Sequence, residues 1–511
     1  MSRTENAIRN TKYAFISKVS ALILGFISRT VFVYFLGDAL LGVNSLYTDV
    51  LTALSFAELG FGTALVYAMY APVARNDTEY VIKLLDYYKW IYRIIAGIVA
   101  ILGIAIIPFL QYLVKNAKGL TLFELRLYFA IFLFNTVTSY FVTYKFSYLN
   151  ALQKNYLSTN INTAINFVTV IVQIIVILVF RNFLLYLLAQ SLIGVLSKIF
   201  VIQYLDRKFP ILKEKPEVPL SREEKQPIFN EVRGLVVHQF SSVAVHQTDS
   251  MIISSLTGLG VIAVGFVNNY NLLINGVLGF VVQVFHSFTS GFGNLAAESS
   301  KERFREVFYT ANFINFWMYG FCSIAFFVLV PPFITLWLGP GRLIDTMSFL
   351  LIIINCYLQG QCIVYGNARA AVGNFNKDKW WSFTQAIVNL VVSIVCAKAF
   401  GLVGVYIGTV TSRLVYVIFR PYSTYSMMFE ESCKRYYIVL AKYFLSTAFA
   451  GAVTYALTYK LLASVTIVKF ILAVFIVGIV PNLIILVMYF RSREFKGVTY
   501  RLKLLRSKKN G

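Results

Sequence analysis

Charged side chains within long apolar stretches are the residues of this sequence best able to do chemistry. An ionised group at the centre of a bilayer costs at least ~2.5–3.5 kcal/mol, so it faces a cavity or a partner. Lys18 and Arg29 are eleven residues apart in one stretch, about three helical turns, and so lie on one side of a helix. We interpret Arg29 as a cavity cation that meets an anionic headgroup, with snorkelling to the outer surface as the alternative. For Lys18, a cavity role and snorkelling to the inner surface are both open.

Acidic groups and a histidine form a second set of candidates. Glu58 lies in the middle of LSFAELGFG, where it either pairs with a cation such as Arg29 or titrates. Asp49 is nine residues earlier, on the opposite face of an ideal helix, and is a weaker candidate. His246 and Asp249 are three residues apart and therefore neighbours on a helix. They are either a proton- or cation-binding pair or a structural hydrogen bond.

Amides and further cations complete the candidates. The sequence NNYNLLING suits either a water-facing wall that meets sugar hydroxyls or hydrogen bonds between helices. Its four amides are Asn268, Asn269, Asn271 and Asn275. Arg413 lies well inside a later apolar stretch and is interpreted as cavity lining. Lys145 and Lys198 lie near the ends of their stretches, so we expect them to snorkel.

The elements that must position these residues are membrane helices. Of the 511 residues, 58% are hydrophobic and 14% are charged, which excludes a soluble globular protein and a disordered chain. We assign the net charge of +23 to Lys and Arg on the cytoplasmic side, not to nucleic-acid binding. Five cysteines without a C-x-x-C pair and three separated histidines predict neither disulfides nor a metal site, and no cofactor is expected.

About fourteen stretches are long and apolar enough to cross roughly 30 Å of hydrocarbon. They begin near Tyr13, Leu41, Trp90, Leu122, Ser158, Phe183, Gly234, Val261, Thr310, Ile344, Trp380, Leu402, Ile438 and Val468. An even count puts both ends on one side, and Lys and Arg concentrate in the loops of that side, taken as the cytoplasm. The stretches from Leu41 and Val261 are long enough for tilt, a kink or a surface extension.

The predicted organisation is two six-span halves followed by two further spans. The segments are an N-terminal lobe (1–205), a cytoplasmic linker (206–232), a C-terminal lobe (233–430), two spans (431–490) and a basic cytoplasmic tail (491–511). We expect the tail to lie on anionic lipid.

A weak internal repeat supports the two halves. LGVNSLY, which begins at Leu41, resembles VGFVNNY, which begins at Val264, and GFG occurs at both Gly60 and Gly291. Internal repeats in membrane carriers place a site at the repeat interface and favour rocking of one half against the other.

Short loops exclude several classes of function. No loop is large enough for the catalytic residues of a membrane enzyme that acts on lipid-linked sugars. The sequence also lacks G-x-x-x-x-G-K-[S/T], G-x-S-x-G and H-E-x-x-H motifs. It therefore predicts a transporter or channel and not an enzyme.

One long segment carries a family resemblance. FISRTVFVYFLGDALLGVNSLYTDVLTALSFAELGFGTALVYAMYAPVARND resembles the opening of Wzx-type oligosaccharide flippases of the polysaccharide biosynthesis transporter family, in the superfamily of MATE and MurJ exporters. Further matches are GFGNLAAESSKE, NFINFWMYGFCSI, ITLWLG and residues 369–373, so the resemblance runs from about Tyr13 to Arg420. Similar proteins tend to carry an acidic residue after the arginine that matches Arg369. This chain has Ala370, so a pairing role there is not carried over.

The resemblance implies an all-α polytopic membrane protein with about fourteen transmembrane helices, two six-helix lobes around a central cationic cavity and two C-terminal helices. It implies transfer of undecaprenyl-diphosphate-linked oligosaccharide repeat units to the outer leaflet of a bacterial plasma membrane by alternating access, for capsule, exopolysaccharide or other surface polysaccharide. Membrane lipids and other polysaccharide assembly proteins are the implied partners, with both termini cytoplasmic.

The resemblance also suggests roles for the candidate residues. Arg29, aided by Lys18 and Arg413, would hold the diphosphate, and the four asparagines would meet sugar. Glu58, Asp249 and His246 would be counter-charges or coupling sites for H⁺ or Na⁺. The alternatives are a lipid II flippase, a MATE-like cation-coupled drug antiporter and a non-transporting scaffold. The cations of the first span argue against the antiporter.

Overall fold

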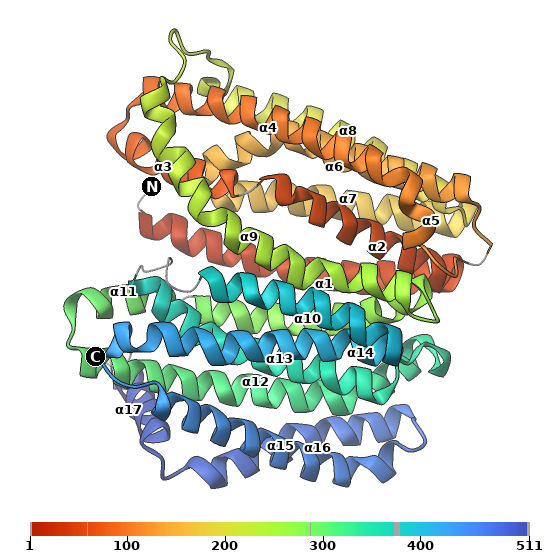
Figure 1. The fold of residues 1–511 in the computed structure, drawn as a ribbon, viewed down its shortest axis with the longest axis vertical. Helices are drawn as coiled ribbons and strands as arrows, with labels where there is room; N and C mark the ends of the chain where they lie inside the picture. Colours follow the sequence, from red (N-terminus) through yellow and green to blue (C-terminus); the bar gives the residue numbers. More distant parts are fainter. Residues whose placement is uncertain (1–2, 59, 118, 287, 373–378, 508–511) are drawn as a thin grey trace. The chain divides into compact units, whose positions relative to one another are not determined.

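The protein is built from α-helices in two compact units. The computed structural model describes residues 3–58, 60–117, 119–286, 288–372 and 379–507, and within these ranges it contains no β-strand (Figure 1). The N unit comprises Met1–Asn268 and the C unit comprises Asn269–Gly511. We describe each unit by itself.

The N unit holds the first nine helices and the start of the tenth. They are α1 (Arg3–Leu36), α2 (Asp38–Leu54), the 3₁₀ turn η1 (Ser55–Glu58), α3 (Phe61–Arg75), α4 (Thr78–Ile106), η2 (Ile107–Phe109), α5 (Leu110–Leu113), α6 (Leu122–Ala151), α7 (Asn155–Phe180), α8 (Phe183–Lys208), η3 (Pro210–Lys213), α9 (Arg222–Leu256) and α10 (Val261–His286). Local capping explains several of the starts. Thr121 with Glu124 and Ser221 with Glu224 form capping boxes that satisfy free N–H groups at the first turns of α6 and α9.

The C unit continues with the rest of α10 and seven more helices. They are α11 (Phe288–Glu298), α12 (Lys301–Leu338), α13 (Thr346–Val372), α14 (Lys379–Phe429), α15 (Lys434–Leu462), α16 (Ile467–Tyr489) and α17 (Arg493–Ser507), with the 3₁₀ turn η4 (Pro340–Arg342) between α12 and α13. Helix α13 packs between α12 and α14, and α12 also packs against α15 and α16 (Figure 1).

Eleven helices of the described part are long and apolar enough to cross a membrane. One of them, Trp380–Phe429, has 50 residues. This is far more than a single crossing of ~30 Å needs at 1.5 Å per residue. The chain reverses inside it at Gly401, which has φ +58°, and an ideal Cβ on Gly404 would lie 2.0 Å from the carbonyl oxygen of Cys396. Helix α14 is therefore two limbs packed side by side, as the predicted starts near Trp380 and Leu402 require.

The two remaining predicted spans correspond to elements that are broken or polar. The stretch from Leu41 is α2, η1 and α3, so of the three expected alternatives (tilt, a kink or a surface extension) it has a kink. The stretch from Gly234 lies in α9. All fourteen predicted stretches thus coincide with helical segments, and the all-α polytopic membrane fold is confirmed. The division between the two compact units falls inside α10. The predicted lobe boundaries stay a prediction.

The C unit has an aromatic core that joins α15, α16 and α17 to α12. The ring of Phe316 stacks on that of Tyr443 with centroids 4.1 Å apart. Trp317 donates its indole N–H to Asn482 Oδ1 at 2.7 Å. Phe495 and Val498 of α17 pack against the same cluster, so the predicted basic tail is a helix partly docked on α12.

A close helix crossing fixes the start of α10 within the N unit. An ideal Cβ on Gly42 of α2 would lie 1.9 Å from the carbonyl oxygen of Val261, and one on Gly265 of α10 would lie 2.6 Å from that of Asp38. Each glycine thus lies against a backbone carbonyl of the other helix. In each case this carbonyl belongs to the residue four positions before the partner glycine. Small residues permit such close approach in membrane helices. These glycines are the matched positions of the predicted internal repeat.

This crossing yields a stability prediction. We expect Gly42→Ala to destabilise the protein by about 1–3 kcal/mol, because the added methyl group meets backbone that cannot move aside as a side chain would. The measurement is thermal unfolding of the purified protein in detergent. Gly97→Ala on α4 is the matched control, since no atom lies within 4 Å of its ideal Cβ. Equal unfolding temperatures for the two variants would contradict a close contact between α2 and α10 at Gly42.

Candidate functional site

Arg29 and Asn268, both predicted site residues, are joined in the N unit. Arg29 Nη2 donates to Asn268 Oδ1 at 2.6 Å, and both residues are half-buried. A hydrogen bond from a guanidinium is charge-assisted and among the stronger kinds. It links α1 to the first turns of α10, one helical turn beyond the glycine crossing. A predicted phosphate-binding cation and a predicted sugar-binding amide are therefore in direct contact.

Aromatic side chains surround the helical turn that follows Arg29. The ring of Phe32 packs edge-on against Phe183 at 5.8 Å and Tyr186 at 5.3 Å between centroids. This packing holds α1 against α8. Helix α1 is unbroken from Arg3 to Leu36, so Lys18 shares it with Arg29 as predicted, and Lys18 is exposed.

Glu58 lies where the second predicted span breaks, at the end of η1. Its Oε1 accepts a hydrogen bond from the hydroxyl of Tyr92 on α4, so the described partner of Glu58 is a tyrosine and not Arg29. Tyr92 stacks on Tyr88 with centroids 5.0 Å apart, and Tyr88 donates to the carbonyl oxygen of Gly62 at 2.8 Å. An ideal Cβ on Gly62 would lie 2.6 Å from Glu58 Oε1, so a glycine is required to make room for the carboxylate.

The other predicted acidic residues lie on neighbouring helices α2 and α9. Ser250 Oγ donates to Asp49 Oδ2, which joins the two helices. Asp249 precedes Ser250 on α9 and is half-buried. The side chain of His246 lies outside the described part of the structure, so its predicted pairing with Asp249 stays a prediction.

The four asparagines of α10 do not have the same surroundings. Asn268, Asn271 and Asn275 follow the i, i+3, i+7 spacing that places residues on one helical face. Asn268 and Asn271 are half-buried and Asn275 is exposed. Asn269 is 0% exposed, which fits hydrogen bonding between helices. The contact of the four amides with sugar stays a prediction.

Arg413 is buried in the C unit. It is 6% exposed, and its Nε donates to Asn355 Oδ1 of α13 at 3.1 Å. This pair links α13 to the second limb of α14.

Sequence reasoning did not identify the partners Tyr92 and Asn355. Both are ordinary polar residues of long apolar stretches, and only the packing of α4 on η1 and of α14 on α13 makes them neighbours of a charge. Lys145 also differs from its prediction. It does not snorkel but forms an ion pair with Asp206 and is 2% exposed. Lys198 donates to Thr138 Oγ1 at 2.6 Å.

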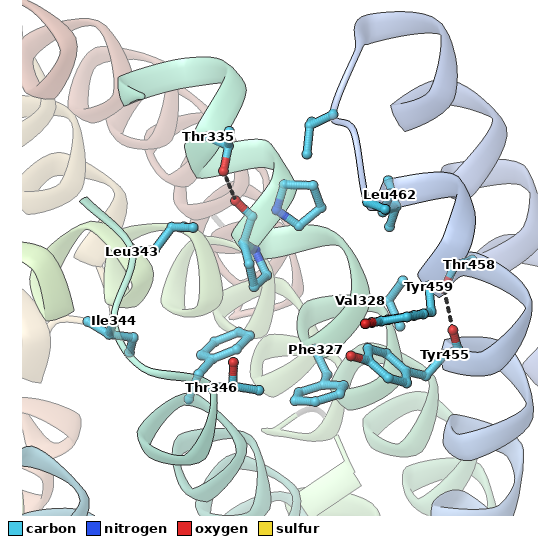
Figure 2. A pocket seen from close by; sticks show the side chains of 15 residues that line it. Phe327, Val328, Thr335, Leu343, Ile344, Thr346, Tyr455, Thr458, Tyr459 and Leu462 are labelled. Atoms are coloured by element: carbon cyan, nitrogen blue, oxygen red, sulfur yellow. Dashed lines mark hydrogen bonds between the residues drawn. The ribbon is translucent and has the colours of Figure 1, made fainter. Parts of the chain in front are cut away.

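A cavity of about 280 Å³ in the C unit lies between α12, α13 and α15 (Figure 2). No charged side chain lines it. Thr335 Oγ1 donates to the carbonyl oxygen of Pro331 at 3.0 Å, and Thr458 Oγ1 to that of Tyr455 at 3.2 Å, so these hydroxyls are satisfied by their own helices (Figure 2). The lining offers apolar contact and no group that would hold a charged ligand. Within the described residues, no group of His, Cys, Asp or Glu side chains could hold a metal ion.

Comparison with known proteins gives the chain a family and a fold. The family described as "Polysaccharide biosynthesis protein" matches residues 7–290. No curated protein matches the sequence. Among solved structures, the chain is similar to the lipid II flippase MurJ in its inward closed conformation, with 13% identity, a TM-score of 0.67, and coverage of 94% of this chain and 99% of that one.

Two further structures are similar. A Vibrio cholerae MATE transporter, VcmN, has 14% identity and a TM-score of 0.57, with coverage of 84% of this chain and 98% of that one. A MOP superfamily transporter from Pyrococcus furiosus has 16% identity and a TM-score of 0.53, with coverage of 82% and 94%. At these identities the likenesses show the fold. The chain is a multi-pass membrane protein with the fold shared by MurJ and MATE transporters, and it belongs to the polysaccharide biosynthesis protein family.

Proposed function

We propose that this protein is a flippase for oligosaccharide repeat units linked to undecaprenyl diphosphate, working by alternating access in a bacterial plasma membrane with both termini in the cytoplasm. The family membership supports a role in polysaccharide synthesis. The observation that carries the proposal is the contact between Arg29 and Asn268, because it joins a cation and an amide inside predicted spans.

The chemistry of the pair suits the head of a lipid-linked sugar. A guanidinium carries five N–H donors in a fixed fork, which matches two phosphate oxygens at once. In a site of low dielectric this attraction is stronger than in water. Arg29 would hold the diphosphate, with Lys18 earlier in α1 and Arg413 in the C unit as further cations.

The face of α10 that carries Asn268 would meet the sugar. Asn271 and Asn275 continue this face, and an amide both donates to and accepts from sugar hydroxyls. The prenyl chain would remain in the lipid, since moving it into a polar cavity gains no free energy. Other polysaccharide assembly proteins would supply and receive the repeat units.

Glu58 is the proposed coupling residue for H⁺ or Na⁺. It lies at the break between α2 and α3, where a change in its protonation or ion binding would alter the hydrogen bond with Tyr92 and thus the contact of η1 with α4. Asp249 and His246 on α9 are the second proposed coupling pair, beside the contact of Ser250 with Asp49.

The first test removes the charge of Arg29. We expect Arg29→Gln to weaken binding of the lipid-linked repeat unit about 10- to 100-fold, since a charge-assisted hydrogen bond contributes about 1.5–3 kcal/mol. A strain without the gene should lose surface polysaccharide and accumulate lipid-linked repeat units in the cytoplasmic leaflet. The wild-type gene should restore the polymer, whereas Arg29→Gln should not.

Lys398→Gln is the control, because Lys398 is an exposed cation of the C unit and its loss removes the same charge. It should restore surface polymer fully. If Arg29→Gln restores the polymer, Arg29 does not bind the diphosphate, but the protein can still be a flippase. Normal polymer in the deleted strain with altered drug sensitivity would instead favour a cation-coupled drug antiporter, and a block in cell-wall synthesis would favour a lipid II flippase.

The second test concerns coupling. We expect Glu58→Gln, which keeps the side-chain shape but cannot ionise, to abolish the response of transport to an imposed H⁺ or Na⁺ gradient while substrate still binds. Transport of a fluorescent lipid-linked oligosaccharide in proteoliposomes provides the measurement. Tyr92→Phe keeps the ring stacked on Tyr88 but removes the hydroxyl donor, and it should also weaken the gradient response, because the proposed coupling acts through this hydrogen bond. An unchanged response in Glu58→Gln would exclude Glu58 as the coupling residue.

A further inference from the structure

A polar pocket lies in the N unit, and its lining residue Tyr140 has its ring centroid 5.9 Å from that of Tyr92, the hydrogen-bond partner of Glu58. It has a volume of about 390 Å³ and is lined by α4, α6, α8 and η3. None of the predicted site residues lines it. It includes the beginning of the segment after α8, on the side to which the distribution of Lys and Arg assigns the cytoplasm.

The wall that α6 and α8 contribute contains a buried ion pair. Lys145 is 2% exposed, pairs with Asp206, and has its ammonium group 5.2 Å from the ring centroid of Tyr144. An ion pair taken out of water is costly to disrupt, because removal of one partner leaves the other charge buried. The pair therefore fixes α6 against the end of α8 and gives the pocket a rigid wall.

Cations outnumber acids around this pocket. Besides Lys145, the cations in the lining are Lys89, Arg93, Lys213 and Lys215. The acids are Asp86, Asp206 and Glu214, of which Asp206 already pairs with Lys145. The ion pairs recorded among the described residues involve none of the four other cations. The lining therefore has a positive excess.

The spacing of the two cations on α4 is unfavourable for the helix. Lys89 and Arg93 are four residues apart, so they are neighbours on one face of the helix, and like charges at this spacing destabilise it. Lys89 is half-buried, which strengthens the repulsion because fewer water molecules screen it. Asp86, three residues before Lys89, offsets part of this penalty, and a bound anion would offset more of it.

Part of the remaining lining is apolar. Leu85, Phe141, Ile202 and Leu212 face the same pocket, and Phe141 is 48% exposed. Phe141 and Ile202 belong to helices that qualify as membrane spans, so the apolar part adjoins the hydrocarbon region. Cations next to apolar side chains at the cytoplasmic end of membrane helices match the headgroup and upper acyl chain of an anionic phospholipid.

We propose that this pocket binds a phosphate group, held by Lys89 and Arg93 of α4 and by Lys213 and Lys215 of the segment after α8. The bound phosphate would tie the start of the 206–232 segment to α4. Its two possible sources are the headgroup of an anionic phospholipid and soluble phosphate, which the experiment distinguishes. The proposal does not depend on the flippase function.

The test uses native mass spectrometry of the full-length protein, purified in detergent and stripped of lipid. Phosphatidylglycerol and phosphatidylcholine with identical acyl chains are titrated separately, and inorganic phosphate is titrated by calorimetry. We expect selective retention of phosphatidylglycerol by the wild type, and a loss of about tenfold or more in its affinity in Lys89→Gln/Arg93→Gln. Arg75→Gln/Arg222→Gln removes two exposed cations outside the pocket and should bind as the wild type does.

A second variant protects the test against misfolding. Lys213→Gln/Lys215→Gln changes exposed positions at the end of η3 and after it, and it should also weaken phosphatidylglycerol binding. A third outcome is that the wild type binds inorganic phosphate in calorimetry but does not distinguish the two lipids. If both pocket variants then lose phosphate binding, the pocket is supported with soluble phosphate as its ligand. Two results would overturn the proposal. In the first, the wild type binds both lipids equally and does not bind phosphate. In the second, the pocket variants bind phosphatidylglycerol as well as the control variant does.

Discussion

The crossing of α2 and α10 at Gly42 and Gly265 is the contact on which the candidate site depends. Because each glycine lies against a backbone carbonyl of the other helix, the first turns of α10 have one position relative to α2. Asn268 follows Gly265 by three residues, and this position brings its side-chain oxygen to Arg29. A larger residue at either glycine would move α10 and separate the cation from the amide.

Three contacts show how a membrane protein accommodates polar groups. Arg29 contacts Asn268, Glu58 accepts from Tyr92, and Arg413 donates to Asn355. These contacts all join separate helices, so the charged groups help to determine which helices pack together. In each of these contacts a charged side chain shares a hydrogen bond with a neutral polar side chain.

The two cationic places of the N unit differ in construction. Arg29 and Phe32, which packs against aromatic residues of α8, lie on α1. The pocket of Lys89 and Arg93 lies between the first half of α4 and the last turns of α6 and α8, beside the beginning of the 206–232 segment. The Lys145–Asp206 ion pair fixes its wall. The first place suits a substrate that arrives and leaves, whereas the second suits a resident anion of the membrane surface.

The sequence by itself determined the membrane helices and much of their order. Hydropathy adds up along the chain, so each of the fourteen stretches could be recognised without its neighbours, including the kinked stretch from Leu41 and the reversal before Leu402. The continuity of α1, which carries both Lys18 and Arg29, followed from the same pattern. The repeat of LGVNSLY and VGFVNNY also marked the two glycines, although not their contact.

Only the tertiary structure decided which polar side chains meet. Asn268 and Arg29 are 239 positions apart in the chain, and Lys145 and Asp206 are 61 apart. A hydrogen bond or ion pair depends on distances of a few ångströms that arise when helices pack, and local hydropathy is nearly the same for many pairings. For this reason the sequence could name Glu58 and Arg413 as unusual, but it could not identify Tyr92 and Asn355 as their partners.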